Sequence, residues 1–178
     1  MIVSKTPIKR IKQAGILRAH IAEDTNAYRL FNGFYEGYPG LILDRFGSTL
    51  VVMNHAEKPV SEKFLHEIAE WASFSQPWLT AILFKQRQSL IANEKWGRLL
   101  AGDQLSTQVN EFGVSYALDL QMHQDASFYL DTRNLRNWLF HNTYGMRVLN
   151  TFAYTGSLGV SAGAGGAVCV VQTDINRI

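Results

Sequence analysis

One pattern near the end of the chain limits the fold more than any other. A predicted strand at residues 147–152 is followed by Gly156, by a helix of mostly small residues up to 164, and by a second predicted strand at 167–172. A strand, a helix and a strand of these lengths form a right-handed βαβ unit with parallel strands. The sequence therefore predicts an α/β fold in which a doubly wound, Rossmann-like sheet begins here.

The loop that follows the first of these strands is typical of a ligand site. A glycine directly after a buried strand lets a ligand approach the backbone, and the next helix offers free N–H groups at its N-terminus. Asp174 follows the second strand, where an acid can accept hydrogen bonds from both hydroxyls of a ribose. Gly156-Ser-Leu-Gly159 lacks the third glycine of the dinucleotide motif, which favours a nucleoside without a pyrophosphate. A plain α/β turn with an exposed aspartate is the alternative.

Composition narrows the class of protein. The chain has 178 residues, of which 47% are hydrophobic and 18% charged, enough for one or two globular domains. The only cysteine, Cys169, lies in an apolar run and is expected to be buried in a strand. One cysteine cannot form an internal disulfide, and no apolar run is long enough to span a membrane, so we expect a cytoplasmic protein.

Upstream of the βαβ unit, the apolar runs predict a small α+β module at residues 24–120. The expected strands are 28–31, 40–43, 49–53, 80–84, 104–110 and 114–120, with a hairpin loop at 44–48, a helix at 59–74 and a turn at 111–113. After residue 120, Asp131 is expected to cap a helix whose apolar stripe is Leu135, Trp138 and Leu139. Residues 121–178 then form the second unit.

Basic residues suggest contacts with nucleic acid at two places. Residues 1–22 hold five lysines and arginines and no acid, and their spacing predicts a basic amphipathic helix at 5–23. A second basic stretch, 84–88, carries Lys85 and Arg87 on the flank of a predicted hairpin. The candidate RNA contacts are Lys9, Arg10, Lys12, Lys85 and Arg87. A solvated helix face and a charged hairpin flank are the alternatives.

Several separated motifs resemble one known family. Phe-Tyr-Leu-Asp-Thr-Arg at 128–133 lies between Asp-Leu-Gln at 119–121 and Asn-Thr-Phe-Ala-Tyr-Thr-Gly at 150–156. Together they resemble the class I S-adenosylmethionine-dependent methyltransferases of large-subunit ribosomal RNA, the branch with the 5-methylcytosine and 7-methylguanine enzymes. Upstream, residues 26–30 and 37–47 resemble the central module of that family. The likeness extends from about residue 5 to the end of the chain.

The resemblance implies S-adenosylmethionine as cofactor and RNA, in particular large-subunit ribosomal RNA, as partner, with the protein a monomer or a homodimer. Asp174 matches the acid that would hold the ribose, and Arg133 would lie beside the carboxylate of the cofactor. The cofactor-binding residues that it implies are Phe128, Asp131, Arg133, Asn150, Phe152, Tyr154, Thr155, Gly156 and Asp174. It implies no metal.

The chain also departs from the family pattern. Thr132 replaces a glutamine, and Asp125 lies where the family often has a lysine. The later Asp-Pro-Pro motif and the nucleophilic cysteine of the cytosine enzymes are missing, as is the N-terminal RNA-binding domain. We therefore expect a truncated enzyme without catalytic residues, inactive by itself. A non-catalytic RNA-binding module and a nucleotide-dependent oxidoreductase fragment are the rival hypotheses.

Overall fold

A five-stranded mixed sheet lies at the centre of the first unit. The computed structural model describes residues 7–122 and 125–175. The strands follow one another across the sheet in chain order, and only β3 and β4 are parallel neighbours, joined by a crossover through α3. They are β1 (Ala27–Asn32), β2 (Leu41–Phe46), β3 (Thr49–Asn54), β4 (Ala81–Gln86) and β5 (Arg98–Ala101), with the crossover helix α3 at Glu62–Ser75.

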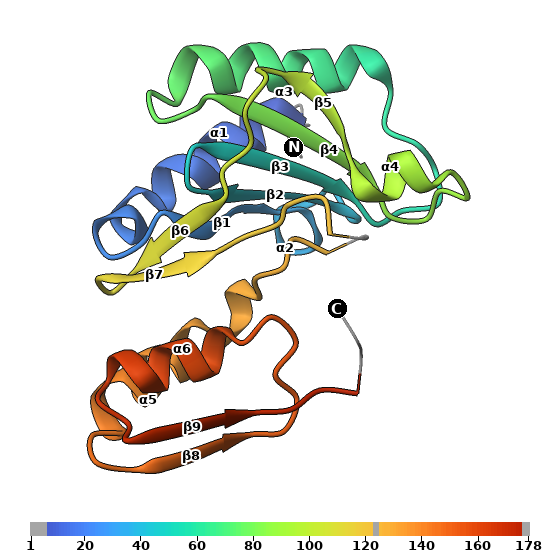
Figure 1. The fold of residues 1–178 in the computed structure, drawn as a ribbon. Coiled ribbons are helices and arrows are strands. Elements are labelled where there is room, and N and C mark those ends of the chain that lie inside the picture. The colour runs from blue at the N-terminus through green and yellow to red at the C-terminus, as the bar shows by residue number, and fades with distance from the viewer. Residues whose placement is uncertain (1–6, 123–124, 176–178) are drawn as a thin grey trace.

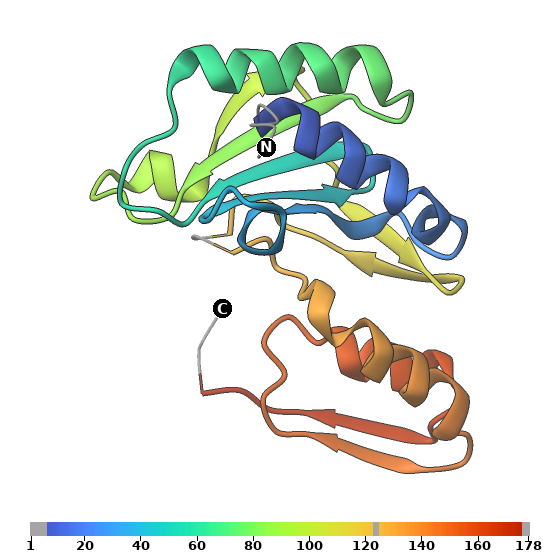
Figure 2. The ribbon, with the colours of Figure 1, turned by 180° about the vertical axis from the view of Figure 1, so that it is seen from behind.

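Side chains alternate between the two faces of this sheet because a strand has a period of two. In β3, Leu50 and Val52 belong to one buried cluster, whereas Val51 and Met53 belong to another. Helices α1 (Pro7–Leu17) and α3 cover the first cluster (Figure 1; Figure 2). Both faces of the sheet are therefore buried, each under a different layer. The short helices of this unit are η1 (Ala19–Glu23), α2 (Gly33–Glu36) and α4 (Ala92–Trp96).

A hairpin and the segment after it cover the second face. The hairpin consists of β6 (Gln108–Glu111) and β7 (Val114–Ala117), and it buries Val109 and Tyr116 against the sheet. Leu120 and Phe128 from the following segment join the same cluster. The boundary that we predicted at residue 120 thus falls inside a continuous core.

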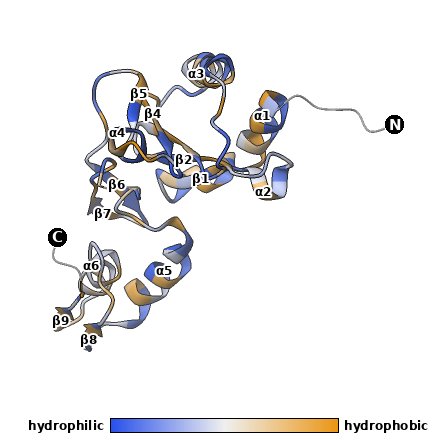
Figure 3. Ribbon diagram, turned by 90° about the vertical axis from the view of Figure 1, so that its right-hand side faces the viewer, coloured by the Kyte–Doolittle hydropathy of each residue, from blue (hydrophilic) through white to orange (hydrophobic). Residues whose placement is uncertain are grey.

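The C-terminal unit is a parallel βαβ motif with one helix before it, as predicted. It comprises η2 (Leu130–Thr132), α5 (Arg133–Asn142), β8 (Arg147–Asn150), α6 (Ser157–Ala164) and β9 (Cys169–Gln172). Helices α5 and α6 cover one face of the β8–β9 pair and lie between that pair and the β6–β7 hairpin (Figure 3). Cys169 lies in β9, as expected, but is only half-buried.

Small residues in α6 allow it to lie close against α5. The Ser161 hydroxyl donates to the backbone oxygen of Arg136 at 2.6 Å. Thr143, which follows α5, donates to the backbone oxygen of Ala162 at 2.9 Å. A Cβ atom on Gly165 would come within 2.3 Å of the backbone oxygen of Phe140, so a larger residue would force the two segments apart.

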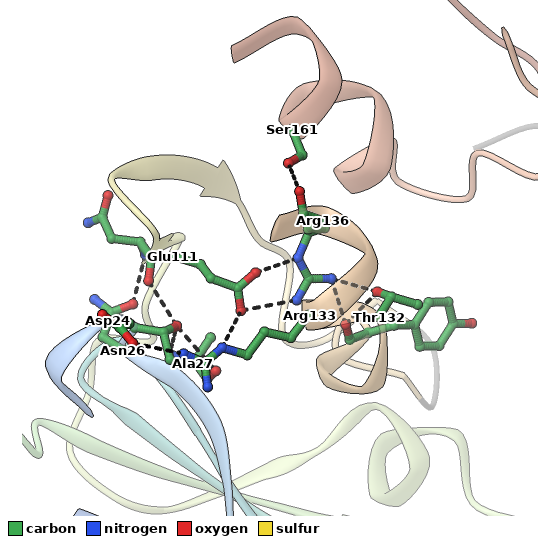
Figure 4. A network of polar contacts seen from close by, with 11 residues as sticks. Asp24, Asn26, Ala27, Glu111, Thr132, Arg133, Arg136 and Ser161 are labelled. Atoms are coloured by element: carbon green, nitrogen blue, oxygen red, sulfur yellow. Dashed lines mark hydrogen bonds and ion pairs between the residues drawn. The ribbon is translucent and has the colours of Figure 1, made fainter. Parts of the chain in front are cut away.

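A buried ion pair joins the two units. Arg136 of α5 and Glu111 of β6 both have fully buried side chains, and Arg136 Nε lies 2.6 Å from Glu111 Oε1 (Figure 4). The guanidinium also donates to the backbone oxygen of Tyr129 and to the hydroxyl of Thr132. Its carbon lies 4.0 Å from the centre of the Phe128 ring. The charges are therefore paired and hydrogen-bonded, the condition under which burial is tolerated.

Several details of the expected fold are wrong. The N-terminal helix ends at Leu17 and continues as the 3₁₀ turn η1, and the expected loop at 44–48 is strand as far as Phe46. Asp131 caps no helix, because it lies within η2 and Thr132 occupies the N-cap of α5. The strand β5 and the helix α4 were not expected.

The buried face of α5 also differs from the prediction. Leu135 and Trp138, expected to face inward, are 46% and 57% exposed, whereas Arg136 between them is fully buried. The helix turns its arginine inward because Glu111 supplies a partner there. Within the described ranges, no helix is both long and apolar enough to cross a membrane.

The ion pair gives a test of this architecture. Glu111→Gln leaves the buried Arg136 charge without its counterion and should lower the free energy of unfolding by about 3–5 kcal/mol in urea titrations. Adding Arg136→Met should make the double variant more stable than the sum of the two single losses predicts. The matched control is Glu62→Gln, which breaks the exposed pair with Arg98 and should cost less than about 1 kcal/mol. Equal losses for the two glutamates would contradict the assigned role of Glu111.

Candidate functional site

The loop after β8 and the residues after β9 meet at one end of the C-terminal unit. The backbone N–H of Tyr154 donates to Asp174 Oδ2 at 2.7 Å. Ala153 N–H donates to the Thr173 carbonyl at 3.0 Å, and Thr173 N–H donates to the Asn150 carbonyl at 2.9 Å. These bonds hold the Asp174 carboxylate against the loop, at the carboxyl ends of two parallel strands, where α/β folds bind ligands.

Two glycines let α6 begin close beside β9. Gly156 has a φ of 88°, a left-handed conformation that favours glycine, and it is the N-cap of α6 without a side-chain hydrogen bond. A Cβ atom on Gly156 would come within 2.9 Å of the Gln172 side chain, and one on Gly159 within 2.3 Å. The Gln172 side chain therefore fills the space beside both glycines, and a larger residue at either position would collide with it.

The loop is also tied to the segment before α5. The Thr155 hydroxyl donates to the Ser127 carbonyl at 2.5 Å, and the rings of Tyr129 and Tyr154 lie 4.8 Å apart. Ser127 and Tyr154 both have positive φ, 56° and 51°, which costs conformational energy for residues with side chains. Burial, followed by the charge of nearby Asp125, raises the pKa of Tyr154 to about 12, so its hydroxyl stays protonated at neutral pH.

The structure brings six of the nine predicted cofactor residues together. They are Asn150, Phe152, Tyr154, Thr155, Gly156 and Asp174. Phe152 is 78% exposed on this loop. Asp131 is exposed and lies in the η2 turn, two residues after Tyr129.

Phe128 and Arg133 lie elsewhere. Phe128 is 4% exposed, and its ring packs beneath Arg136 and beside Tyr116. The Arg133 guanidinium lies 3.5 Å from Asp24 and 3.7 Å from Glu111, and over the ring of Phe112 (Figure 4). These protein contacts give both residues a role in the junction of the two units. Their contact with a cofactor stays a prediction.

Some of the predicted RNA contacts have exposed side chains, and others are already bonded to groups of the protein. Lys9 and Lys12 are exposed on α1. Arg10 donates to the Glu36 carbonyl, and Arg87 lies 3.2 Å from Asp125. The prediction for Lys85 is wrong, because β4 extends to Gln86 and Lys85 is 1% exposed, with its ammonium donating to the Asp125 carbonyl at 2.5 Å.

Sequence reasoning missed the polar residues on the second face of the sheet. Asp44 is 1% exposed and accepts hydrogen bonds from Arg29 at both carboxylate oxygens, at 2.9 and 3.1 Å. Burial raises the pKa of Asp44 in spite of this partner. His55 and Asp44 both line a small pocket on this face of the sheet. In the part of the chain that the structure describes, no three His, Cys, Asp or Glu residues gather as a metal site.

Comparison with known proteins gives a consistent result. A family model described as S-adenosylmethionine-dependent methyltransferase matches residues 45–178. Ribosomal RNA large subunit methyltransferase I of Serratia proteamaculans (strain 568) is 30% identical over 179 residues, covering 96% of this chain and 44% of that protein. Ribosomal RNA large subunit methyltransferase K/L of Colwellia psychrerythraea (strain 34H) is 30% identical over 163 residues, covering 88% of this chain and 22% of that protein. The chain spans less than half the length of these curated relatives.

Solved structures agree with the fold. A putative S-adenosylmethionine-dependent methyltransferase from Streptococcus mutans superposes with a TM-score of 0.77 at 27% identity, covering 99% of this chain and 47% of that one. A putative methyltransferase complexed with S-adenosylhomocysteine gives a TM-score of 0.76 at 27% identity, covering 96% of this chain and 44% of that one. The α/β architecture, with a Rossmann-like second unit, is thereby confirmed.

The burial of Lys85 predicts a pH effect on stability. Burial lowers the pKa of Lys85 from 10.5 to about 8, so between these values the unfolded chain binds more protons than the folded one. Stability contributed at this position is therefore present above pH 10.5 and is lost as the pH falls through 8. Relative to Lys85→Met, the wild-type free energy of unfolding should rise by ~3 kcal/mol between pH 8 and 10.5. Exposed Lys63→Met is the control, and a constant difference for Lys85→Met would contradict the burial.

Proposed function

Because this chain belongs to the S-adenosylmethionine-dependent methyltransferase family, we propose that the loop after β8 and Asp174 hold that cofactor. The single observation that carries the proposal is the hydrogen bond from Tyr154 N–H to Asp174, which joins the two halves of the predicted site. It fixes an acid just after β9, beside a glycine turn and a helix N-terminus without a side-chain cap. This arrangement suits a nucleoside that carries a charged amino-acid group.

The local geometry supports this fit. The glycines at 156 and 159 let the start of α6 lie close against the Gln172 side chain of β9, which keeps the helix N-terminus beside Asp174. The first N–H groups of α6 would donate to the carboxylate of the cofactor. Asp174 would accept hydrogen bonds from the ribose hydroxyls, and the exposed Phe152 would contribute an apolar surface. Asn150 and Thr155 flank these groups on the same loop.

The chemistry needs little from the protein beyond alignment. The bound cofactor supplies a methyl group that is already activated by its sulfonium centre. The residues of this chain would fix the donor, exclude water from it and bring the acceptor into line. Tyr154 stays neutral at physiological pH, so it adds no negative charge beside the donor. We assign no catalytic residue within the described part of the chain.

For the acceptor, we propose a base of large-subunit ribosomal RNA. The names of the relatives support this class of substrate, and the motifs at 128–133 and 150–156 resemble the branch that methylates cytosine or guanine. The exposed lysines of α1 would contact RNA phosphates. Lys9 and Lys12 carry this role better than Arg10, which is bonded to α2.

Calorimetry tests the cofactor proposal. S-adenosylhomocysteine should bind this chain, and NAD should not. Asp174→Asn should weaken binding about ten- to a hundredfold, because an amide keeps an acceptor for Tyr154 N–H but lacks the charge that strengthens hydrogen bonds to the ribose. Asp103→Asn, an exposed acid between β5 and β6, is the matched control. Tighter binding of NAD would favour an oxidoreductase, and no binding of either would refute the proposed site.

Salt dependence tests the RNA proposal. The double variant Lys9→Gln and Lys12→Gln should weaken binding of a single-stranded fragment of large-subunit ribosomal RNA and reduce the slope of log affinity against log salt by roughly 1.4. A control that removes the same charge elsewhere, Lys63→Gln with Arg147→Gln, should change the slope less. Equal effects of the two double variants would show that net charge, and not α1, governs RNA binding.

A further inference from the structure

A small pocket lies between the second face of the central sheet and the segment that leads into α5. Its volume is about 180 Å³, and its lining comes from β1, β2 and β3, from His55 and Arg87 just after β3 and β4, and from the 125–131 segment. Pockets for whole drug-sized ligands run from roughly 300 to 1,000 Å³, so this one suits a single flat group. A whole nucleoside with its amino-acid tail would not fit inside it.

The lining of the pocket is partly apolar and partly polar. Phe46, Met53 and Phe128 belong to the buried core and line one part of it. The polar groups of the lining are two ion pairs, Arg29–Asp44 and Arg87–Asp125, together with His55, Tyr129 and Asp131. A flipped nucleobase requires both apolar contacts to its faces and hydrogen-bond partners for its polar edge.

One polar atom in the pocket lining lacks a partner. His55 Nε2 is buried and makes no hydrogen bond within the described residues. Burial, then the nearby charges of Arg87 and Arg29, lower the pKa of His55, so its imidazole is neutral at physiological pH. A neutral imidazole nitrogen can donate or accept according to its tautomer. A buried nitrogen of this kind is costly unless something bonds to it, which suggests a ligand.

The pocket adjoins the cofactor loop. Tyr129 lines it, and the Tyr129 ring lies 4.8 Å from the Tyr154 ring of the loop. Ser127, two residues earlier, accepts the hydrogen bond of Thr155. A group held in this pocket would therefore lie near the loop that we assign to the methyl donor, next to the Tyr129–Tyr154 ring pair.

We propose that this pocket binds the acceptor nucleobase of single-stranded RNA after the base has left its stack. The apolar residues of the lining would contact the face of the base, and His55, Arg29 and Arg87 would bond to its polar edge. The inference rests on the proposed function, because it gives a place to the second substrate of methyl transfer. It adds a binding site beside strands β1–β3 of the five-stranded sheet, outside the βαβ unit.

Nuclear magnetic resonance on the whole chain tests the proposal directly. The probes are adenosine, cytidine, guanosine and uridine, each added up to millimolar concentration with and without S-adenosylhomocysteine. At least one nucleoside should shift the Met53 methyl and the His55 ring signals. The Met146 methyl, next to β8 and 54% exposed, reports non-specific binding and should not move.

Two variants make the test independent of a folding defect. His55→Ala should weaken the responding nucleoside about tenfold, the loss expected for one hydrogen bond to a buried partner. Arg87→Gln, at a half-exposed position, should weaken it by a similar factor. His66→Ala is the matched control, since the His66 side chain is 75% exposed on α3 and its ion pair is with Glu70.

The outcomes separate the two proposals. If S-adenosylhomocysteine binds but no nucleoside shifts Met53 or His55, the base pocket is refuted and the proposed function stands. If S-adenosylhomocysteine itself shifts both signals and nucleosides do not, the pocket belongs to the cofactor, and the inference is wrong. If S-adenosylhomocysteine does not bind at all, the proposed function fails, whatever the nucleosides do. Nucleoside shifts that survive both variants would also overturn the assignment.

Discussion

The buried ion pair between Glu111 and Arg136 is the contact on which the arrangement of the two units depends. Neither side chain is exposed, so each charge would be costly without the other. Arg136 also bonds to the Tyr129 carbonyl and the Thr132 hydroxyl, which fixes the η2 turn relative to β6. One guanidinium thereby sets the position of a hairpin, a turn and a helix.

The geometry of the candidate site depends on the junction that Glu111 and Arg136 form. The η2 turn carries Tyr129 on one side of the site, and Tyr154 faces it from the loop after β8. The bond from Thr155 to Ser127 adds a second tie between the same segments. Because both Ser127 and Tyr154 have left-handed backbones, the surrounding contacts must hold them there. The loop after β8 and the pocket lined by Tyr129 are therefore held in place by the same contacts.

Local patterns were enough to predict the βαβ unit, since apolar runs, a glycine turn and small residues all agree there. They failed where a polar residue is buried against a partner far along the chain. Lys85 and Asp44 looked like flank and loop residues, yet their partners, Asp125 and Arg29, lie 40 and 15 positions away. The same holds for Arg136 and Glu111, 25 positions apart. Such pairs form only once the fold has brought their strands and helices together, so no local sequence pattern predicts them.

The five-stranded sheet and the β8–β9 pair differ in how far their side chains are buried. The five-stranded sheet buries side chains on both faces, whereas β8 and β9 pair only with each other among the described residues and leave Leu149 and Val171 63% and 47% exposed. A sheet of two strands is marginally stable in water by itself. Within these residues, the position of the βαβ unit therefore depends on the docking of α5 against the β6–β7 hairpin. Local opening at the candidate site would be resisted by these contacts rather than by the pairing of β8 with β9.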